Sequence, residues 1–209
     1  NLQSNYPEVL NIIETVRMVA KKIRDTSRIG FSYMREGDIY LNLGNYSEAL
    51  KKYQTALDIR KANGNKFGIA NSLLSIGNIY WHQSNYLEAL ENYQTALNIY
   101  VEFGVKDGIA NAKHSIGNIN FQQGNYPEAL NNYLFSLKIL EEIGNIGGIA
   151  ELNNNIGLIY SRQNNYSEAL KSYQAALKIF IKTGNKGNIA GVYLNIGNIY
   201  QSMSNYFES

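Results

Sequence analysis

Side chains that could carry out catalysis are sparse in this sequence. The chain has two histidines, His82 and His114, and no cysteine. In neighbouring copies of the 40-residue repeat described below, the two histidines lie about 12 Å apart in helical rise, too far for a shared metal ion or a catalytic pair. The sequence contains neither a phosphate-binding loop motif nor a zinc-protease motif. It therefore predicts no catalytic, metal or cofactor site, and no cofactor.

Amide side chains, in contrast, recur at a fixed interval. Asn78, Asn118 and Asn198 occupy one position of the repeat, where Asp38 and Leu158 stand in the other copies. An asparagine amide both donates and accepts hydrogen bonds, so a row of them could hold an extended peptide backbone whatever its sequence. The same residues could instead be ordinary surface groups or join neighbouring helices, and both interpretations stay open.

The composition is that of a globular protein. The 209 residues are 44% hydrophobic and 17% charged, and the net charge of +2 gives no electrostatic reason to expect nucleic acid or an anionic membrane as partner. No apolar run approaches the roughly 18–20 residues of a membrane span. The lack of cysteine excludes disulfides and fits a reducing compartment, so we expect a cytoplasmic protein.

The chain is built from a repeat of 40 residues, marked by glycines at 37, 77, 117, 157 and 197. Within residues 65–104, apolar residues follow helical spacing first from Leu73 to Tyr80 and then from Tyr86 to Tyr100. Each unit therefore predicts a hairpin of two helices of about 18 residues, and the fold class is all-α. The predicted organisation is one continuous solenoid: a degenerate helix at 1–24, four units at 25–64, 65–104, 105–144 and 145–184, and a first helix with the start of a second at 185–209.

Capping residues mark the predicted helix ends. Asn85 with Glu88 matches a capping box at the start of the second helix, and the pair recurs at 45/48, 125/128, 165/168, 5/8 and 205/208. Asp25, Asn65, Asn145 and Asn185 are placed to cap first helices. Glycines at 64, 104, 144 and 184 follow second helices, where a left-handed residue commonly ends a helix.

The pattern Leu73-x2-Ile76-Gly77-x2-Tyr80, followed by Ala89, Tyr93 and Ala96, resembles the tetratricopeptide repeat. The match covers nearly the whole chain. The 40-residue unit resembles the long repeats of kinesin light chains, spindle-orientation adaptors and bacterial signalling proteins. The resemblance implies a right-handed α-α superhelix in which glycine and alanine let paired helices approach closely and tyrosines fill the surrounding space.

The resemblance also implies a concave groove, lined by first helices, that holds a peptide or partner protein. The residues at matching positions are Asn71, Leu74, Asn78, Trp81, His82, Asn111, His114, Asn118, Phe121, Gln122, Asn154, Leu158, Arg162 and Asn198. Leu41, Trp81 and Phe121 form an apolar step along this face, and either ligand anchoring or packing between repeats would explain it. The groove lacks the Lys/Arg cluster with which some relatives hold a terminal carboxylate.

These observations predict a non-catalytic scaffold for protein–protein interaction that binds a peptide or partner domain in its groove. The alternative is a regulatory or sensor segment of a larger bacterial signalling protein, such as a kinase, protease or transcription regulator. An apolar edge around Tyr193, Ile196 and Tyr200 could also support self-association.

Overall fold

The computed structural model describes residues 6–207, and every described element is a helix. The helices are α1 (Tyr6–Lys22), α2 (Thr26–Asn42), α3 (Tyr46–Ala62), α4 (Lys66–His82), α5 (Tyr86–Glu102), α6 (Lys106–Gln122), α7 (Tyr126–Ile143), α8 (Ile146–Arg162), α9 (Tyr166–Thr183) and α10 (Lys186–Phe207). The predicted all-α fold and the predicted succession of helices are confirmed.

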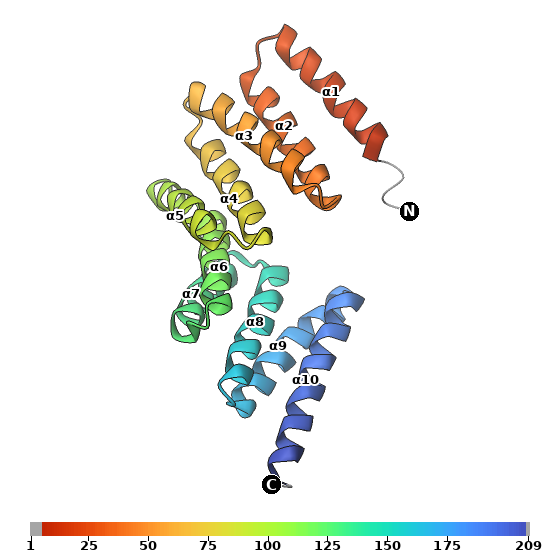
Figure 1. Cartoon of the computed structure of the whole chain (residues 1–209), viewed down its shortest axis with the longest axis vertical. Helices are drawn as coiled ribbons and strands as arrows, with labels where there is room; N and C mark the ends of the chain where they lie inside the picture. The colour runs from red at the N-terminus through yellow and green to blue at the C-terminus, as the bar shows by residue number, and fades with distance from the viewer. Residues whose placement is uncertain (1–5, 208–209) are drawn as a thin grey trace. The chain divides into compact units, whose positions relative to one another are not determined.

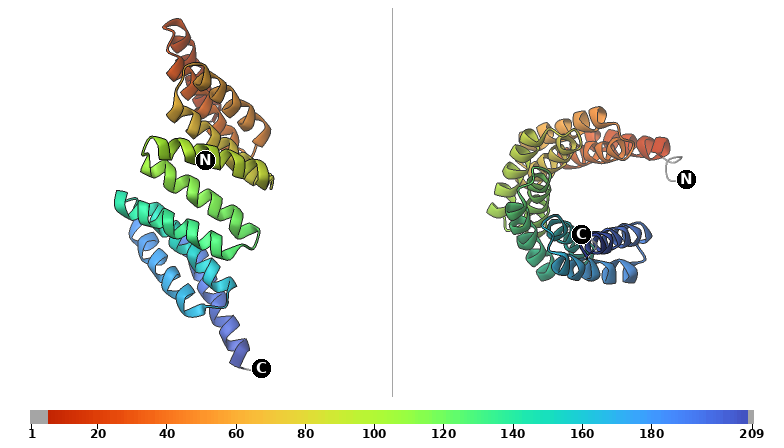
Figure 2. Two further views of the ribbon diagram at one scale, coloured as in Figure 1. Left: turned by 90° about the vertical axis from the view of Figure 1, so that its left-hand side faces the viewer. Right: turned by 60° about the horizontal axis from the view of Figure 1, so that its bottom comes forward.

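The helices form two compact units, Asn1–Gly108 and Ile109–Ser209. In the first unit, successive helices from α1 to α5 pack on one another. In the second unit, successive helices from α7 to α10 do the same. Figures 1 and 2 show the consecutive helices of each unit as antiparallel hairpins. Each unit is thus a stack in which a helical hairpin buries its apolar stripe against its neighbour.

A glycine–tyrosine contact closes each complete hairpin. A Cβ atom added to Gly77 would lie 2.6 Å from the ring of Tyr93, and one added to Gly157 would lie 2.7 Å from the ring of Tyr173. These tyrosine rings are almost fully buried. The predicted close approach of the paired helices therefore depends on two features: the first helix has a glycine without a side chain, and the second helix supplies a tyrosine ring that packs against it.

A buried ion pair attaches α1 to the first complete hairpin. Arg17 Nη1 on α1 lies 2.5 Å from Glu36 Oε1 on α2, and Lys52 Nζ on α3 lies 2.8 Å from Glu36 Oε2. The guanidinium of Arg17 also stands 4.5 Å from the centre of the Tyr33 ring. Three helices thus meet at one buried carboxylate.

The predicted caps of the first helices are confirmed, because the side chains of Asp25, Asn65, Asn145 and Asn185 each accept a hydrogen bond from the backbone N–H three residues on. The predicted C-terminal glycines have positive φ values between 63° and 71°. Asn5 and the side chains of Asn205 and Glu208 lie outside the described residues.

The capping boxes of the second helices are wrong in most units. Asn45 accepts from the backbone N–H of Glu48 at 3.2 Å, but Asn85, Asn125 and Asn165 make no such side-chain bond. The backbone N–H of each of these asparagines, like that of Asn45, donates to the carbonyl five residues earlier. This bond satisfies the N–H group that the glutamate side chain of a capping box would otherwise bind, at Asn45 as well as at the other three asparagines.

The last helix differs from the repeat pattern. Positive-φ residues such as Ser84 and Asn164 end the corresponding helices, whereas α10 continues unbroken to Phe207 (Figure 2). The side chains of Tyr193 and Tyr200 are more than half exposed, as predicted, while Ile196 packs partly against the core. Among the described helices, none has the combination of length and apolarity needed to cross a membrane.

Candidate functional site

We call the repeat position of Asn78, Asn118 and Asn198 the asparagine ladder. Two of these side chains accept hydrogen bonds from buried tyrosines of the following helix. The hydroxyl of Tyr93 donates to Asn78 Oδ1 at 2.7 Å, and that of Tyr133 donates to Asn118 Oδ1 at 2.7 Å. Asp38 accepts from Tyr53 in the same way, at 2.9 Å. Burial raises the pKa of the Tyr53 and Tyr133 hydroxyls, so these groups remain donors. The carboxamide oxygen therefore holds the hairpin, and the Nδ2 group is the part of each side chain that this bond leaves for another partner.

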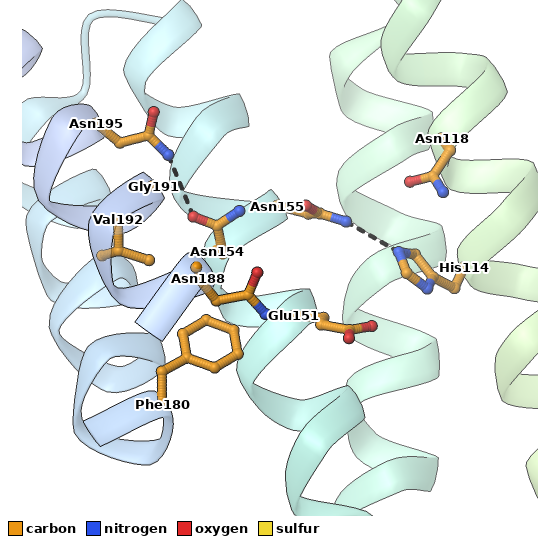
Figure 3. Close-up of a pocket in the computed structure, with 11 residues that line it drawn as sticks. His114, Asn118, Glu151, Asn154, Asn155, Phe180, Asn188, Gly191, Val192 and Asn195 are labelled. Atoms are coloured by element: carbon orange, nitrogen blue, oxygen red, sulfur yellow. Dashed lines mark hydrogen bonds between the residues drawn. The ribbon is translucent and has the colours of Figure 1, made fainter. Parts of the chain in front are cut away.

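The second unit contains a cavity of about 350 Å³. We call it the amide cavity, because five of its eleven lining residues are asparagines: Asn118, Asn154, Asn155, Asn188 and Asn195. They stand on α6, α8 and α10, which are first helices of successive repeats. Figure 3 shows them with Glu151, His114 and the ring of Phe180 around the same space. The cavity lies near the lower end of the roughly 300–1,000 Å³ typical of ligand pockets.

Hydrogen bonds between the asparagines orient several of the amides. Asn195 Nδ2 donates to Asn154 Oδ1 at 3.2 Å (Figure 3). This bond leaves Asn154 Nδ2 as a donor and Asn195 Oδ1 as an acceptor for another partner. Asn118 Oδ1 is held by Tyr133. The walls of the amide cavity thus carry both donors and acceptors, which is the requirement for binding a peptide backbone.

The uncharged imidazole of His114 lines the amide cavity. Its Nε2 atom lies 2.9 Å from Nδ2 of Asn155, and because an amide nitrogen only donates, Nε2 accepts and the ring proton is on Nδ1. Burial lowers the pKa of the imidazole to about 4. The ring also packs edge-on against Tyr133, with centroids 5.6 Å apart. His114 is therefore an uncharged polar group at neutral pH.

A second cavity of about 460 Å³ in the same unit brings together the predicted residues Leu158, Arg162 and Asn198. Asn195 lines both cavities, so they adjoin along α10. Tyr173 also lines the second cavity, and Leu158 offers its hydroxyl no acceptor where Asn118 serves Tyr133. Leu158, which replaces asparagine at this repeat position, thus lines the second cavity together with Arg162.

The first unit has a cavity of about 290 Å³ that includes the predicted residues Asn71 and Leu74. Asn71 Oδ1 accepts from the hydroxyl of Tyr100 at 2.6 Å. Charged side chains are more frequent here, since Arg35, Asp38 and Arg60 also line the cavity.

The other predicted residues lie outside these three cavities. Trp81 is half-buried and meets His82 edge-on at 5.0 Å, and its Nε1 atom is buried with no hydrogen-bond partner among the described residues. His82 stacks on Tyr46 at 5.3 Å. Phe121 packs partly against the core of the second unit, and Asn111 and Gln122 are exposed.

The cavity residues that the sequence did not identify as binding residues share one property: they line the space only because helices converge there. One of them, Asn155, follows the predicted groove residue Asn154. The others lie three residues from a predicted residue: Asn188 comes after the cap Asn185, and Asn195 comes before Asn198. The apolar residues Phe180 and Val192 have the helical spacing of core residues. The signal that could have found them is the change from the repeat consensus, with Phe180 where Tyr100 stands and Gly191 where Asn71 stands. Among the described residues, no group of three or more His, Cys, Asp or Glu is placed to hold a metal ion.

Comparisons with known proteins agree with this architecture. A family model described as tetratricopeptide repeat matches residues 28–102 and 108–182. No curated protein matches. Similar solved structures include BtubC (BKLC) from P. vanneervenii, with TM-score 0.79, 18% identity and coverage of 93% of this chain and 83% of that one.

Two further structures share the fold at low identity. A Rap protein complexed with Competence and Sporulation Factor has TM-score 0.74 and 18% identity, covering 87% of this chain and 51% of that one. Aspartyl phosphate phosphatase F from Bacillus subtilis has TM-score 0.82 and 12% identity, covering 99% of this chain and 55% of that one. With its repeats, its Gly–Tyr hairpin contacts and a family match over most of its length, the chain belongs to the tetratricopeptide repeat family.

Proposed function

We propose that this protein is a non-catalytic interaction scaffold and that the second unit binds an extended peptide segment of a partner protein across the amide cavity. The observation that carries the proposal is the set of five asparagines on three successive first helices around one space. A peptide backbone presents alternating N–H and C=O groups, and these amides supply the matching acceptors and donors. Backbone recognition of this kind gives affinity with little dependence on side chains.

The comparisons support a protein or peptide partner. The chain belongs to the tetratricopeptide repeat family, and one similar solved structure is a Rap protein complexed with a factor. We propose no catalytic role, since neutral His114 already accepts from Asn155. The name aspartyl phosphate phosphatase describes the Bacillus subtilis protein, which shares 12% identity with this chain.

The predicted residues Asn71, Leu74, Asn78, Trp81 and His82 remain a proposed contact region of the first unit. Asn71 and Leu74 line a cavity there, and Asn78 has the same tyrosine-held oxygen as Asn118. We propose that this region makes additional contacts to the same kind of partner.

The test uses peptides selected from a random phage-displayed library on the whole chain. Gly191→Leu fills the amide cavity, because nothing lies within 4 Å of a Cβ atom added there, and leucine favours a helix over glycine. This variant should fold and lose the selected peptides. Asn118→Asp should weaken binding about tenfold, because it keeps an acceptor for Tyr133, as Asp38 does for Tyr53, but removes the Nδ2 donor.

The matched control is Asn98→Asp on α5, an exposed position of the other unit whose Oδ1 accepts from Gln94, a bond that aspartate keeps. It should leave the affinity of the selected peptides unchanged. Equal affinity of the native chain and Gly191→Leu for every selected peptide would refute the amide cavity as the binding site.

A second function remains a candidate: a regulatory or sensor segment of a larger protein. The observation that favours it is that the matched region amounts to 51% of the Rap protein and 55% of phosphatase F. Sequencing the complete gene tests this alternative. An adjoining kinase, protease or DNA-binding domain would support it, and an array of repeats alone would contradict it.

A further inference from the structure

Two positions of the repeat distinguish the amide cavity from the corresponding cavity of the first unit. The residues at one of them are Asn71, Asn111, Glu151 and Gly191, and those at the other are Arg60, Tyr100, Leu140 and Phe180. In the first unit, Tyr100 reaches across and donates its hydroxyl to Asn71 Oδ1. Phe180 has no hydroxyl to donate, and Glu151, which stands where Asn71 does, is exposed. The bond that Tyr100 makes to Asn71 in the first unit thus has no counterpart here.

Gly191 enlarges the space further. It lies inside α10, where glycine is unfavourable relative to other residues, and nothing stands within 4 Å of where its Cβ would be. Phe180, only 4% exposed, and Val192, only 2% exposed, form an apolar floor. The space beside Gly191 is therefore open and can take a side chain as well as a peptide backbone.

The charge in this cavity has one sign. Of the eleven lining residues, all within the described part of the chain, Glu151 alone carries a formal charge at neutral pH. No lysine or arginine is among the lining residues, and the His114 imidazole is neutral because Nε2 accepts from Asn155. The carboxylate of Glu151 is exposed to solvent at the rim, and no ion pair joins it to another described residue. An incoming cation would thus meet a carboxylate without a competing positive group.

We infer that the amide cavity is a specificity pocket for a basic side chain, arginine or lysine, carried by the bound peptide. The inference rests on the proposed function, since the asparagines must hold the backbone that presents this side chain. The aliphatic stem would pack over Phe180 and Val192, and the charged end would reach Glu151. Arginine fits best, because its remaining N–H groups can donate to amide oxygens and its plane can lie on the Phe180 ring.

The experiment compares the peptides that the random library yields with the native chain, with Glu151→Gln and with Glu141→Gln. Glu141 is an exposed residue of α7 outside the cavity and serves as the matched control. We expect one position enriched in arginine or lysine with the native chain and with Glu141→Gln, and no such enrichment with Glu151→Gln. A synthetic peptide of the selected sequence should bind about tenfold more weakly when its arginine is replaced by neutral citrulline.

The possible results separate this inference from the proposed function. Peptides that are selected by the native chain, are lost with Gly191→Leu and lack a basic position would overturn the inference and leave the proposed function standing. A basic position that persists with Glu151→Gln would overturn it as well. Peptides that bind Gly191→Leu as tightly as the native chain would overturn both.

Discussion

The hydroxyl of Tyr93 donates a 2.7 Å hydrogen bond to Oδ1 of Asn78 across the hairpin of α4 and α5. The same bond joins Tyr133 to Asn118 in the second unit. These asparagines therefore have two roles at once: the oxygen stabilises the hairpin, and the nitrogen lies on the face proposed to bind ligands. The two interpretations that the sequence left open are not mutually exclusive.

The first prediction concerns this bond. Tyr93→Phe and Tyr133→Phe should each lower the free energy of unfolding by about 1 kcal/mol, because a buried acceptor loses its donor. Urea denaturation followed by circular dichroism measures the change. Tyr173→Phe is the matched control, since position 158 is a leucine with no acceptor to lose. An equal loss in all three variants would show that the bond to asparagine contributes nothing.

The second prediction concerns the helix crossings. Gly77→Ala should destabilise the protein by about 1–3 kcal/mol, because the new Cβ would lie 2.6 Å from the buried Tyr93 ring. Gly197→Ala should instead stabilise it by up to about 1 kcal/mol, because nothing lies within 4 Å of that Cβ position. Thermal and urea unfolding of the two variants check the opposite signs, and a shared sign would contradict the packing argument.

The third prediction concerns pH. Because burial lowers the pKa of His114 from 6.5 to about 4, the unfolded chain binds this proton more readily than the folded chain. The stability contribution is complete above pH 6.5 and is lost as the pH falls from 6.5 to 4, by on the order of 3 kcal/mol. His114→Gln keeps an acceptor for Asn155 and cannot titrate.

Urea unfolding of both proteins at pH 7 and at pH 4.5 measures this effect. The difference in stability between the native chain and His114→Gln should shift in favour of the variant at the lower pH. Parallel curves for the two proteins across this range would contradict the assignment of a buried neutral imidazole.

The fourth prediction concerns the attachment of α1. Glu36→Ala should cost about 3–5 kcal/mol, because it leaves the guanidinium of Arg17 buried without its carboxylate. Glu14→Ala is the matched control: Glu14 also pairs with Arg17, at 3.7 Å, but its side chain is 63% exposed. That variant should cost at most about 1 kcal/mol. Hydrogen exchange of α1 should accelerate in Glu36→Ala alone, and equal exchange in both variants would refute the buried ion pair as the anchor.

Much of the fold follows from local pattern. A period of 40 residues, helical spacing of apolar residues and glycines at the ends predicted the hairpins, because each of these signals acts within one or two turns of chain. The capping boxes predicted at Asn85, Asn125 and Asn165 were wrong, because these asparagine side chains accept no capping hydrogen bond. The backbone N–H group that each glutamate would cap already donates to a carbonyl of the preceding helix, a contact that spacing in the sequence does not show.

The candidate site was predictable only in part. His114, Asn118 and Asn154 were expected on the binding face by their repeat position, and they do line one cavity. Phe180 and Gly191 were not expected there, since their effect depends on what they lack: a hydroxyl that Tyr100 has, and a side chain that Asn71 has. Their contribution becomes visible only when α9 and α10 are placed beside α8.

The amino-acid pattern was enough to predict the helices and their pairing, because repetition and side-chain period act along the chain. Contacts between helices settle which atom of Asn78 and of Asn118 is engaged and that the His114 imidazole is neutral. Those properties arise from burial and from donors on other helices, so they depend on distances across space rather than on spacing in the sequence.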